Sequence, residues 1–188
     1  MSKILSRFIC FISLFIYSEA MSYEESSFKV VKKTEIYEIR QYPKRLVAKT
    51  TYDTNDRSGF RKLFKYITGS NELNQEIKMT TPVTEEKEGD KMVMQFFLPA
   101  SFTLQNVPTP NDQNINISTI DAGYYAVLRY TGRTNNRNFI KHKKILDKAL
   151  IKDGIKTNSI PIKAIYNGPF TLPILRRNEV MYNIDWIK

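Results

Sequence analysis

The sequence holds few side chains that could serve as nucleophiles or bind a transition metal. It has one histidine, His142, and one cysteine, Cys10. A Ser-His-Asp triad or a two-histidine metal site would therefore have to use His142 or fail. On a helical projection His142 falls among Phe139, Leu146 and Leu150. This pattern favours a packed, hydrogen-bonded histidine, and we keep His142 as the candidate metal ligand beside that interpretation.

The sequence also lacks the motifs of nucleophilic catalysis. No Gly-x-Ser-x-Gly segment is present, and Cys10 belongs to an apolar run near the N-terminus. Removal of that run would leave no thiol, which excludes disulfides, thiolate nucleophiles, cysteine-based zinc or iron–sulfur sites and cysteine-linked cofactors. We therefore expect a non-catalytic protein.

The first 20 residues have the layout of a secretory signal peptide. Lys3 and Arg7 precede an apolar run over residues 8–17, and Ala20 ends a short stretch suited to cleavage. A membrane anchor is the alternative, but the run is roughly half of the ~20 residues that span a bilayer. We expect residues 1–20 to be removed, leaving a secreted or periplasmic chain without a transmembrane segment.

The net charge of +10 favours anionic partners, which include membranes, nucleic acid and ligands that carry carboxylates. The basic residues are spread along the chain, apart from short clusters at residues 141–144 and 176–177. A solvated basic surface explains this distribution more simply than a dedicated interface. The sequence therefore predicts no specific nucleic-acid site.

Two helices are predicted. Apolar residues recur at helical spacing before Gly69, and a second helix is expected over residues 137–152, ending at Gly154. The apolar positions of the first helix are Phe60, Leu63, Phe64 and Ile67.

Short apolar or alternating runs predict strands around these helices. Pro82 indicates that the segment 77–83 forms an edge or bulged strand, and residues 85–90 are expected to form a turn. The predicted strands cover residues 36–39, 46–51, 91–98, 115–120, 124–130 and 162–165, followed by a last alternating run that includes Val180.

The order of these elements is the same in the two halves of the chain, which predicts two repeats at about residues 28–100 and 115–188 within one domain, 21–188. An offset of 88 residues aligns the apolar face that begins at Met92 with the one that begins at Val180. We expect an α+β fold, a pseudo-twofold distorted antiparallel β-barrel or sheet with two helices packed on one side. Chance similarity of two ordinary α+β units is the alternative.

Several segments, taken in order, resemble the SOUL haem-binding protein family. They are Tyr37-Glu38-Ile39-Arg40-Gln41-Tyr42, the helix 60–69 with Asn71, Ile77-Lys78-Met79-Thr80-Thr81-Pro82-Val83, Phe97-Leu98-Pro99 and Arg177-Asn178-Glu179-Val180. The resemblance runs from about Phe28 to the C-terminus. It implies the pseudo-twofold barrel, haem or a related porphyrin as ligand, and no catalytic residues.

The sequence differs from the family pattern at one position. Family members proposed to bind haem iron through a histidine carry it where this chain has Gln41, and glutamine is a poor iron ligand. The family's other mode of binding, a hydrophobic groove with basic residues near the propionates, needs no such histidine. Carried over to this sequence, that mode implies a cofactor site with the residues Ile77, Lys78, Met79, Arg176 and Arg177.

Three questions stay open at the level of sequence: the iron ligand, the oligomeric state and the identity of the ligand. The fold could serve as a binding module for another small amphipathic molecule, or for a protein partner without haem. A basic protein bound to an anionic membrane or to nucleic acid is a third hypothesis, which rests on charge alone.

Overall fold

The computed structural model describes residues 23–56 and 58–186, so the predicted signal peptide lies outside the described residues. The helices are α1 (Ser58–Ile67), α2 (Asn136–Lys152) and a short 3₁₀ helix, η1 (Pro173–Leu175). The strands are β1 (Glu24–Glu25), β2 (Lys29–Lys33), β3 (Glu38–Tyr42), β4 (Arg45–Asp53), β5 (Thr80–Thr81), β6 (Val83–Glu88), β7 (Lys91–Phe97), β8 (Ile115–Ile120), β9 (Gly123–Tyr130), β10 (Ile162–Ile165) and β11 (Asn178–Ile184).

Nine of the strands form one curled antiparallel sheet in the order β2-β3-β9-β11-β10-β6-β7-β4-β8. Read from one end, the order is β3-β9-β11-β10, and read from the other end it is β8-β4-β7-β6. The two halves of the sheet therefore have the same arrangement of strands, and they meet where β10 pairs with β6. The strands β3 and β8 each pair with a strand from the other half of the chain. A small parallel pair, β1 with β5, stands beside this sheet.

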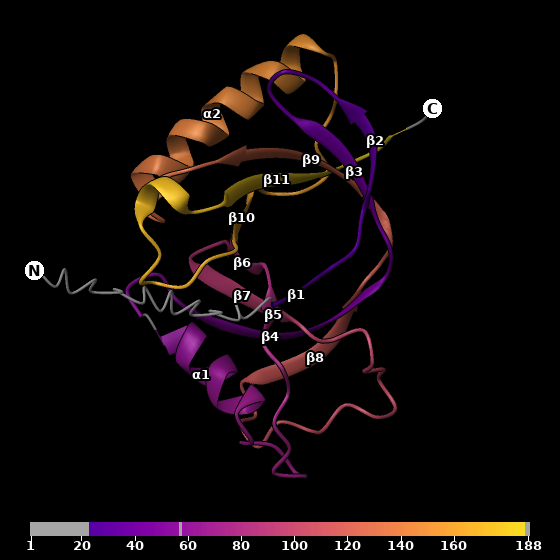
Figure 1. The fold of residues 1–188 in the computed structure, drawn as a ribbon, viewed down its shortest axis with the longest axis vertical. Helices are drawn as coiled ribbons and strands as arrows, with labels where there is room; N and C mark the ends of the chain where they lie inside the picture. The colour runs from indigo at the N-terminus through magenta and orange to yellow at the C-terminus, as the bar shows by residue number, and fades with distance from the viewer. Residues whose placement is uncertain (1–22, 57, 187–188) are drawn as a thin grey trace, which may run out of the picture.

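Both helices pack on the same face of the sheet. Residues paired across neighbouring antiparallel strands point to one side, and an unbroken series of such pairs joins Val180 to Lys163, Lys163 to Glu85 and Glu85 to Met94. Val180 packs under α2 and Met94 packs under α1. Figure 1 shows the two helices at opposite ends of the curl, outside it. The predicted α+β fold is therefore confirmed.

Three apolar clusters form the core, because each strand buries alternate residues on its two faces. One cluster lies between α2 and the strands β3, β9 and β11, and a second between α1 and the strands β4 and β7. The third occupies the inner, concave face and is largely aromatic; its buried members are Tyr42, Tyr125, Val127, Ala164, Tyr166 and Met181.

Local signals account for the ends of both helices. The Asp56 carboxylate accepts a hydrogen bond from the Ser58 N–H at 2.8 Å, and the Asn135 side chain accepts one from the Asn138 N–H at 2.9 Å. Gly69 and Gly154, which follow the helices, have φ values of 108° and 68°. Positive φ costs glycine little, so these residues stop the helices where the sequence predicts.

The segment 77–83 was expected to form an edge or bulged strand, and the structure interrupts it at Pro82. Thr80 and Thr81 pair with β1 alone, whereas β6 starts just after the proline and lies between β10 and β7, inside the sheet. The proline stands outside the hydrogen-bonded ladder, so its missing N–H costs nothing there. The expected turn over residues 85–90 shrinks to Gly89-Asp90, because β6 and β7 remain paired as far as Glu88 and Lys91.

The described residues contain no helix long and apolar enough to cross a membrane.

The interface between α1 and the sheet predicts a test of the fold. Leu63 is fully buried in it, and Leu63→Ala should lower the free energy of unfolding by about 2–5 kcal/mol through lost burial and a residual cavity. Lys65→Ala, on the exposed face of the same helix, should change it by no more than about 0.5 kcal/mol. Urea unfolding followed by circular dichroism measures both, and equal effects would contradict this packing.

Candidate functional site

A cavity of about 580 Å³ lies on the inner face of the sheet, where the N-terminal segment and the β2–β3 hairpin meet β9 and the residue just before β11. We call it the arginine pocket. Its volume falls within the range of about 300–1,000 Å³ typical of small-molecule sites. Its apolar lining includes Phe28, Val30, Ile36 and Val127, and its basic lining consists of Lys33, Arg40, Arg129 and Arg177.

The strand register directs these side chains inward. Glu38 on β3 pairs with Val127 on β9, and Val127 pairs with Met181 on β11, so all three point to the inner face. Arg40 and Arg129 lie two residues further along their strands and point the same way. Ile39, between Glu38 and Arg40, packs under α2 instead.

A fully buried carboxylate, that of Glu179, forms the base of the site. It accepts hydrogen bonds from Arg40 Nη1 at 3.1 and 3.0 Å and from Arg177 Nε at 3.0 Å. The hydroxyl of Tyr166 donates a further bond at 2.7 Å. Two guanidinium groups and a phenol therefore satisfy one buried anion, which would otherwise be very costly to bury.

Two more carboxylates bind the outer sides of these guanidinium groups. Glu38 pairs with Arg40 at 2.8 Å, and Glu25 pairs with Arg177 through two bonds of 2.8 and 2.9 Å. Burial alone would lower the pKa of Arg40 and of Arg177. At Arg40 the attraction of the Glu179 charge outweighs the effect of burial. At Arg177 the hydrogen bonds to Glu25 and the charge of Glu179 together outweigh it. Both pKa values are raised overall, and both arginines stay charged.

Aromatic rings complete the support of the guanidinium groups of Arg40, which is buried, and Arg177, which is half-buried. Arg40 lies 4.3 Å from the ring centroid of Phe28, and Arg177 lies 3.6 Å from that of Tyr166. Such cation–π contacts are strongest where water is excluded. Phe28 also packs against Tyr42 with its ring tilted by 44°, so the N-terminal segment is anchored to the inner face.

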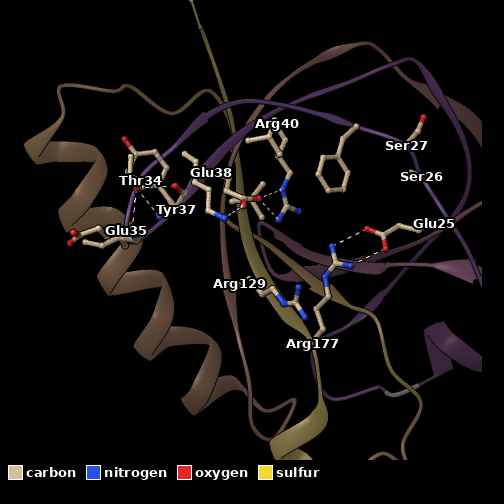
Figure 2. A pocket seen from close by; sticks show the side chains of 15 residues that line it. Glu25, Ser26, Ser27, Thr34, Glu35, Tyr37, Glu38, Arg40, Arg129 and Arg177 are labelled. Carbon is tan, nitrogen blue, oxygen red and sulfur yellow. Dashed lines mark hydrogen bonds and ion pairs between the residues drawn. The ribbon is translucent and has the colours of Figure 1, made fainter.

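Arg129 differs from the other two arginines. It is exposed, and across residues 23–56 and 58–186 no carboxylate lies within 4.0 Å of it. Figure 2 shows its guanidinium beside that of Arg177 at the same opening, with no dashed contact drawn to it. The arginine pocket thus combines apolar walls with one guanidinium available to an anion.

Comparison with known proteins decides the family. The SOUL heme-binding protein family matches residues 23–183. The chain belongs to this family. Human Heme-binding protein 2 is 28% identical over 157 residues, which cover 77% of this chain and 76% of the human protein.

Solved structures support the fold of this SOUL protein. The C-terminal domain of EcmrR matches with a TM-score of 0.60 at 15% identity, over 80% of this chain and 99% of that domain. A hydrolase from Listeria innocua matches with a TM-score of 0.54 at 9% identity, over 82% and 94% of the two chains. At these identities the similarity concerns the fold alone.

The SOUL chain offers no familiar iron ligand among the described residues that line the arginine pocket, which include no histidine, cysteine or methionine. Tyr37 lines it, but its hydroxyl donates to Asp153, and burial together with that bond raises the pKa of Tyr37. Iron binds tyrosine as phenolate, so the raised pKa disfavours this role. Gln41 is exposed and does not line the pocket.

His142 lies on α2, away from the pocket lining. Its ring stacks on Tyr130 with a centroid distance of 4.1 Å, and its Nδ1 lies 2.8 Å from the carbonyl oxygen of Asn138. Within the described ranges no three His, Cys, Asp or Glu side chains gather as a metal site. The position is that of a packed histidine.

The five residues implied by the family resemblance are only partly brought together. Ile77 is buried against α1 and Met79 partly so, while Lys78 is exposed, and none of the three lines the arginine pocket. Arg177 does line it. Glu25 links the segment that follows residues 77–79 to Arg177, because Glu25 pairs with Thr81 between β1 and β5 and also binds Arg177. The role of residues 77–79 in binding stays a prediction.

Arg176 is committed to the structure of its own loop. Its guanidinium donates to the carbonyl oxygens of Thr171 at 2.8 Å and Pro169 at 2.6 Å. These bonds hold the segment in which Phe170 and Leu172 are exposed. Arg176 therefore has fewer donors left for a ligand than Arg129 has.

Sequence reasoning missed Arg40, Arg129 and Glu179 as members of the site. Arg40 and Glu179 occur within the segments that carry the family resemblance, yet 139 residues separate them, and only the sheet order brings them together. The available signal was the start of β3, where the charged residues Glu38 and Arg40 stand on either side of the apolar Ile39.

The shared carboxylate predicts a large effect on stability. Glu179→Gln removes the negative charge that Arg40 and Arg177 share, and the free energy of unfolding should fall by about 3–5 kcal/mol. Glu35→Gln, an exposed acid in the same pocket lining, should change it by less than about 0.5 kcal/mol. Chemical unfolding of both variants measures the difference, and a Glu179→Gln protein as stable as the wild type would refute this account of the network.

Proposed function

We propose that this SOUL protein binds haem or a related tetrapyrrole in the arginine pocket and carries out no reaction on it. The observation that carries the proposal is Arg129, a guanidinium without a carboxylate partner among the described residues, at the mouth of a cavity with apolar walls. A porphyrin presents a flat apolar ring and two carboxylates at one edge. The pocket offers complementary groups for both parts.

The walls suit the ring of the ligand. Phe28, Val30 and Val127 line the cavity with apolar surface, and Phe28 is held in place by Arg40 and Tyr42. A preformed apolar wall binds a flat ligand without the cost of ordering the side chains first.

The propionates would bind at the arginines. Arg129 offers a planar fork of donors, which can form two parallel bonds to one carboxylate. Arg177 already forms such a pair with Glu25, and a ligand carboxylate bound there would form the same two bonds. A propionate can take the place of Glu25, because that residue is exposed and lies on the short strand β1.

Binding in this pocket would depend little on iron, since its described lining has no histidine, cysteine or methionine. The ring and the propionates supply the contacts, and the protein adds no ligand that would set the iron's redox chemistry. This supports a carrier or sensor of tetrapyrroles more than an enzyme.

We further propose that the protein works outside the cytoplasm, as a secreted or periplasmic chain. The basis is the amino-terminal pattern of charge, apolar run and small residues over positions 1–20. The pocket is formed by residues from Glu25 onward, so cleavage after Ala20 would keep it complete.

The first prediction concerns iron. Hemin and metal-free protoporphyrin IX should both bind the purified chain 21–188 with dissociation constants within about fivefold of each other, a difference of roughly 1 kcal/mol. Titration followed by Soret absorbance and tryptophan quenching measures both. Tight binding of hemin with none of protoporphyrin would show that an iron ligand dominates and would contradict the proposed mode.

The second prediction concerns Arg129. Arg129→Gln removes one charge-assisted pair, worth about 1.5–3 kcal/mol, and should weaken hemin binding by about tenfold or more. Arg133→Gln is the matched control, because it removes the same charge from an exposed arginine outside the pocket. Equal affinities for the two variants would place the ligand elsewhere. If purified native protein instead carries a different molecule, identified by mass spectrometry, the ligand is not a tetrapyrrole.

The third prediction concerns export. Full-length protein expressed with a functional secretion system should be recovered outside the cytoplasm with Met21 as its first residue, as shown by N-terminal sequencing. Replacing apolar residues of segment 8–17 by charged ones should keep it inside and uncleaved. Recovery of the uncleaved wild-type chain from the cytoplasm would contradict export.

A further inference from the structure

A second and smaller cavity, of about 200 Å³, lies on the inner face of the sheet between the two halves of the chain. Tyr42 and Tyr125 line it, and they belong to the same inner-face cluster as Val127, which lines the arginine pocket. Its lining is otherwise drawn from β4, β6, β7, β8, β10 and β11 and the segments beside them. No residue that we assign to the haem site lines this second cavity.

Arg45 is the one basic side chain in the described lining of this cavity. Its guanidinium lies 4.3 Å from the ring centroid of Tyr42, 4.8 Å from that of Phe97 and 5.3 Å from that of Tyr125. All three rings are nearly inaccessible to solvent. The cation is therefore enclosed by aromatic side chains, whose π-faces attract it without neutralising it.

Arg45 lacks the anion that such a position demands. In the part of the chain that the structure describes, no carboxylate oxygen lies within 4.0 Å of it, and its buried Nε has no hydrogen-bond partner. Arg40 and Arg177, on the same face, each contact two carboxylates. Arg45 is half-buried, but its Nε is fully buried, and buried polar atoms in proteins are normally hydrogen-bonded. An unpaired cation of this kind beside a cavity points to an anion that is supplied from outside.

The acid in the same cavity does not fill this role. Glu86 accepts a hydrogen bond from Gln95 at 2.8 Å, and it is not within ion-pair distance of Arg45. Burial raises the pKa of Glu86, and the neighbouring Glu88 adds to this, while Lys49 opposes it. Burial lowers the pKa of Arg45, and the Tyr125 and Tyr42 hydroxyl groups oppose this, but an arginine side chain stays protonated in proteins. Among the described residues the cavity therefore presents an arginine that no carboxylate pairs with, beside a carboxyl group that is bonded to Gln95.

We propose that this cavity binds a small organic carboxylate with a compact apolar body, whose carboxylate pairs with Arg45 and whose body lies against Phe97, Met181 and the tyrosine rings. The size sets the class of ligand, because apolar cavities of about 150 Å³ hold one benzene molecule. A cavity of about 200 Å³ accommodates a carboxylate of the size of benzoate and excludes a porphyrin. The site is thus separate from the haem site in both place and ligand.

Benzoate serves as the probe. Calorimetric or NMR titration of the chain 21–188 should show saturable binding of benzoate, and binding of the neutral isostere benzamide should be about tenfold weaker or more, because a charged pair is lost. Arg45→Met keeps the length and apolar stem of the side chain and should abolish the preference for benzoate over benzamide. Arg133→Met, at an exposed arginine outside the cavity, should behave as the wild type.

Thermal unfolding gives a second readout, which detects a variant that simply fails to fold. Arg45→Met should unfold at a temperature equal to or above that of the wild type without ligand, because it removes a charge that has no carboxylate partner and a buried Nε that has no hydrogen-bond partner. Benzoate should raise the unfolding temperature of the wild type alone. If Arg45→Met proves unfolded, Arg45→Lys should keep the charge and bind benzoate more weakly than the wild type but more tightly than benzamide.

Three results would overturn the proposal: equal binding of benzoate and benzamide by the wild type, undiminished benzoate binding by Arg45→Met, or tighter binding of the cation benzamidine than of benzoate. The last would assign the cavity to Glu86. Hemin affinity of Arg45→Met should match that of the wild type, so a failure of this proposal leaves the haem proposal standing, and the reverse also holds.

Discussion

The structure depends on the burial of one carboxylate, that of Glu179, between Arg40 and Arg177. Arg40 lies on β3, from the first half of the chain, and Glu179 lies on β11, from the second. Their ion pair helps to hold β3 beside the strands of the second half, since neither charge can be buried without the other. It also fixes two guanidinium groups on the inner face, beside which the arginine pocket opens.

The position of the N-terminal segment also depends on the buried Glu179, through Arg177. Arg177 has donors beyond those that Glu179 uses, and Glu25 binds them while β1 pairs with β5. Phe28 then covers Arg40 and completes the apolar wall of the pocket. Two of the three arginines are thereby neutralised and held, and Arg129 is left to meet an anion. Membership of the SOUL heme-binding protein family agrees with a ligand of this kind.

Much of the fold could be predicted from local patterns. The alternation that begins at Met92 and at Val180 identified the faces that pack under the helices, and the glycines after both helices marked their ends. The site could not be predicted this way, because Glu179 and Arg40 meet only through the sheet order. The central position of β6 could not be predicted for a related reason. A proline excludes a hydrogen bond at one residue, which fits the break at Pro82, while the strand that starts after it is free to join the centre of the sheet.

The central claim is that a tetrapyrrole lies in the arginine pocket, and mapping its contacts tests this most directly. Amide chemical shifts of the ¹⁵N-labelled chain 21–188 should be recorded with and without a diamagnetic metalloporphyrin, gallium protoporphyrin IX. The account predicts that the largest changes fall on Phe28 to Arg40 and around Arg129 and Arg177. Changes confined to α1 and residues 77–79, with β2 and β3 unaffected, would contradict it and place the ligand in a groove beside that helix.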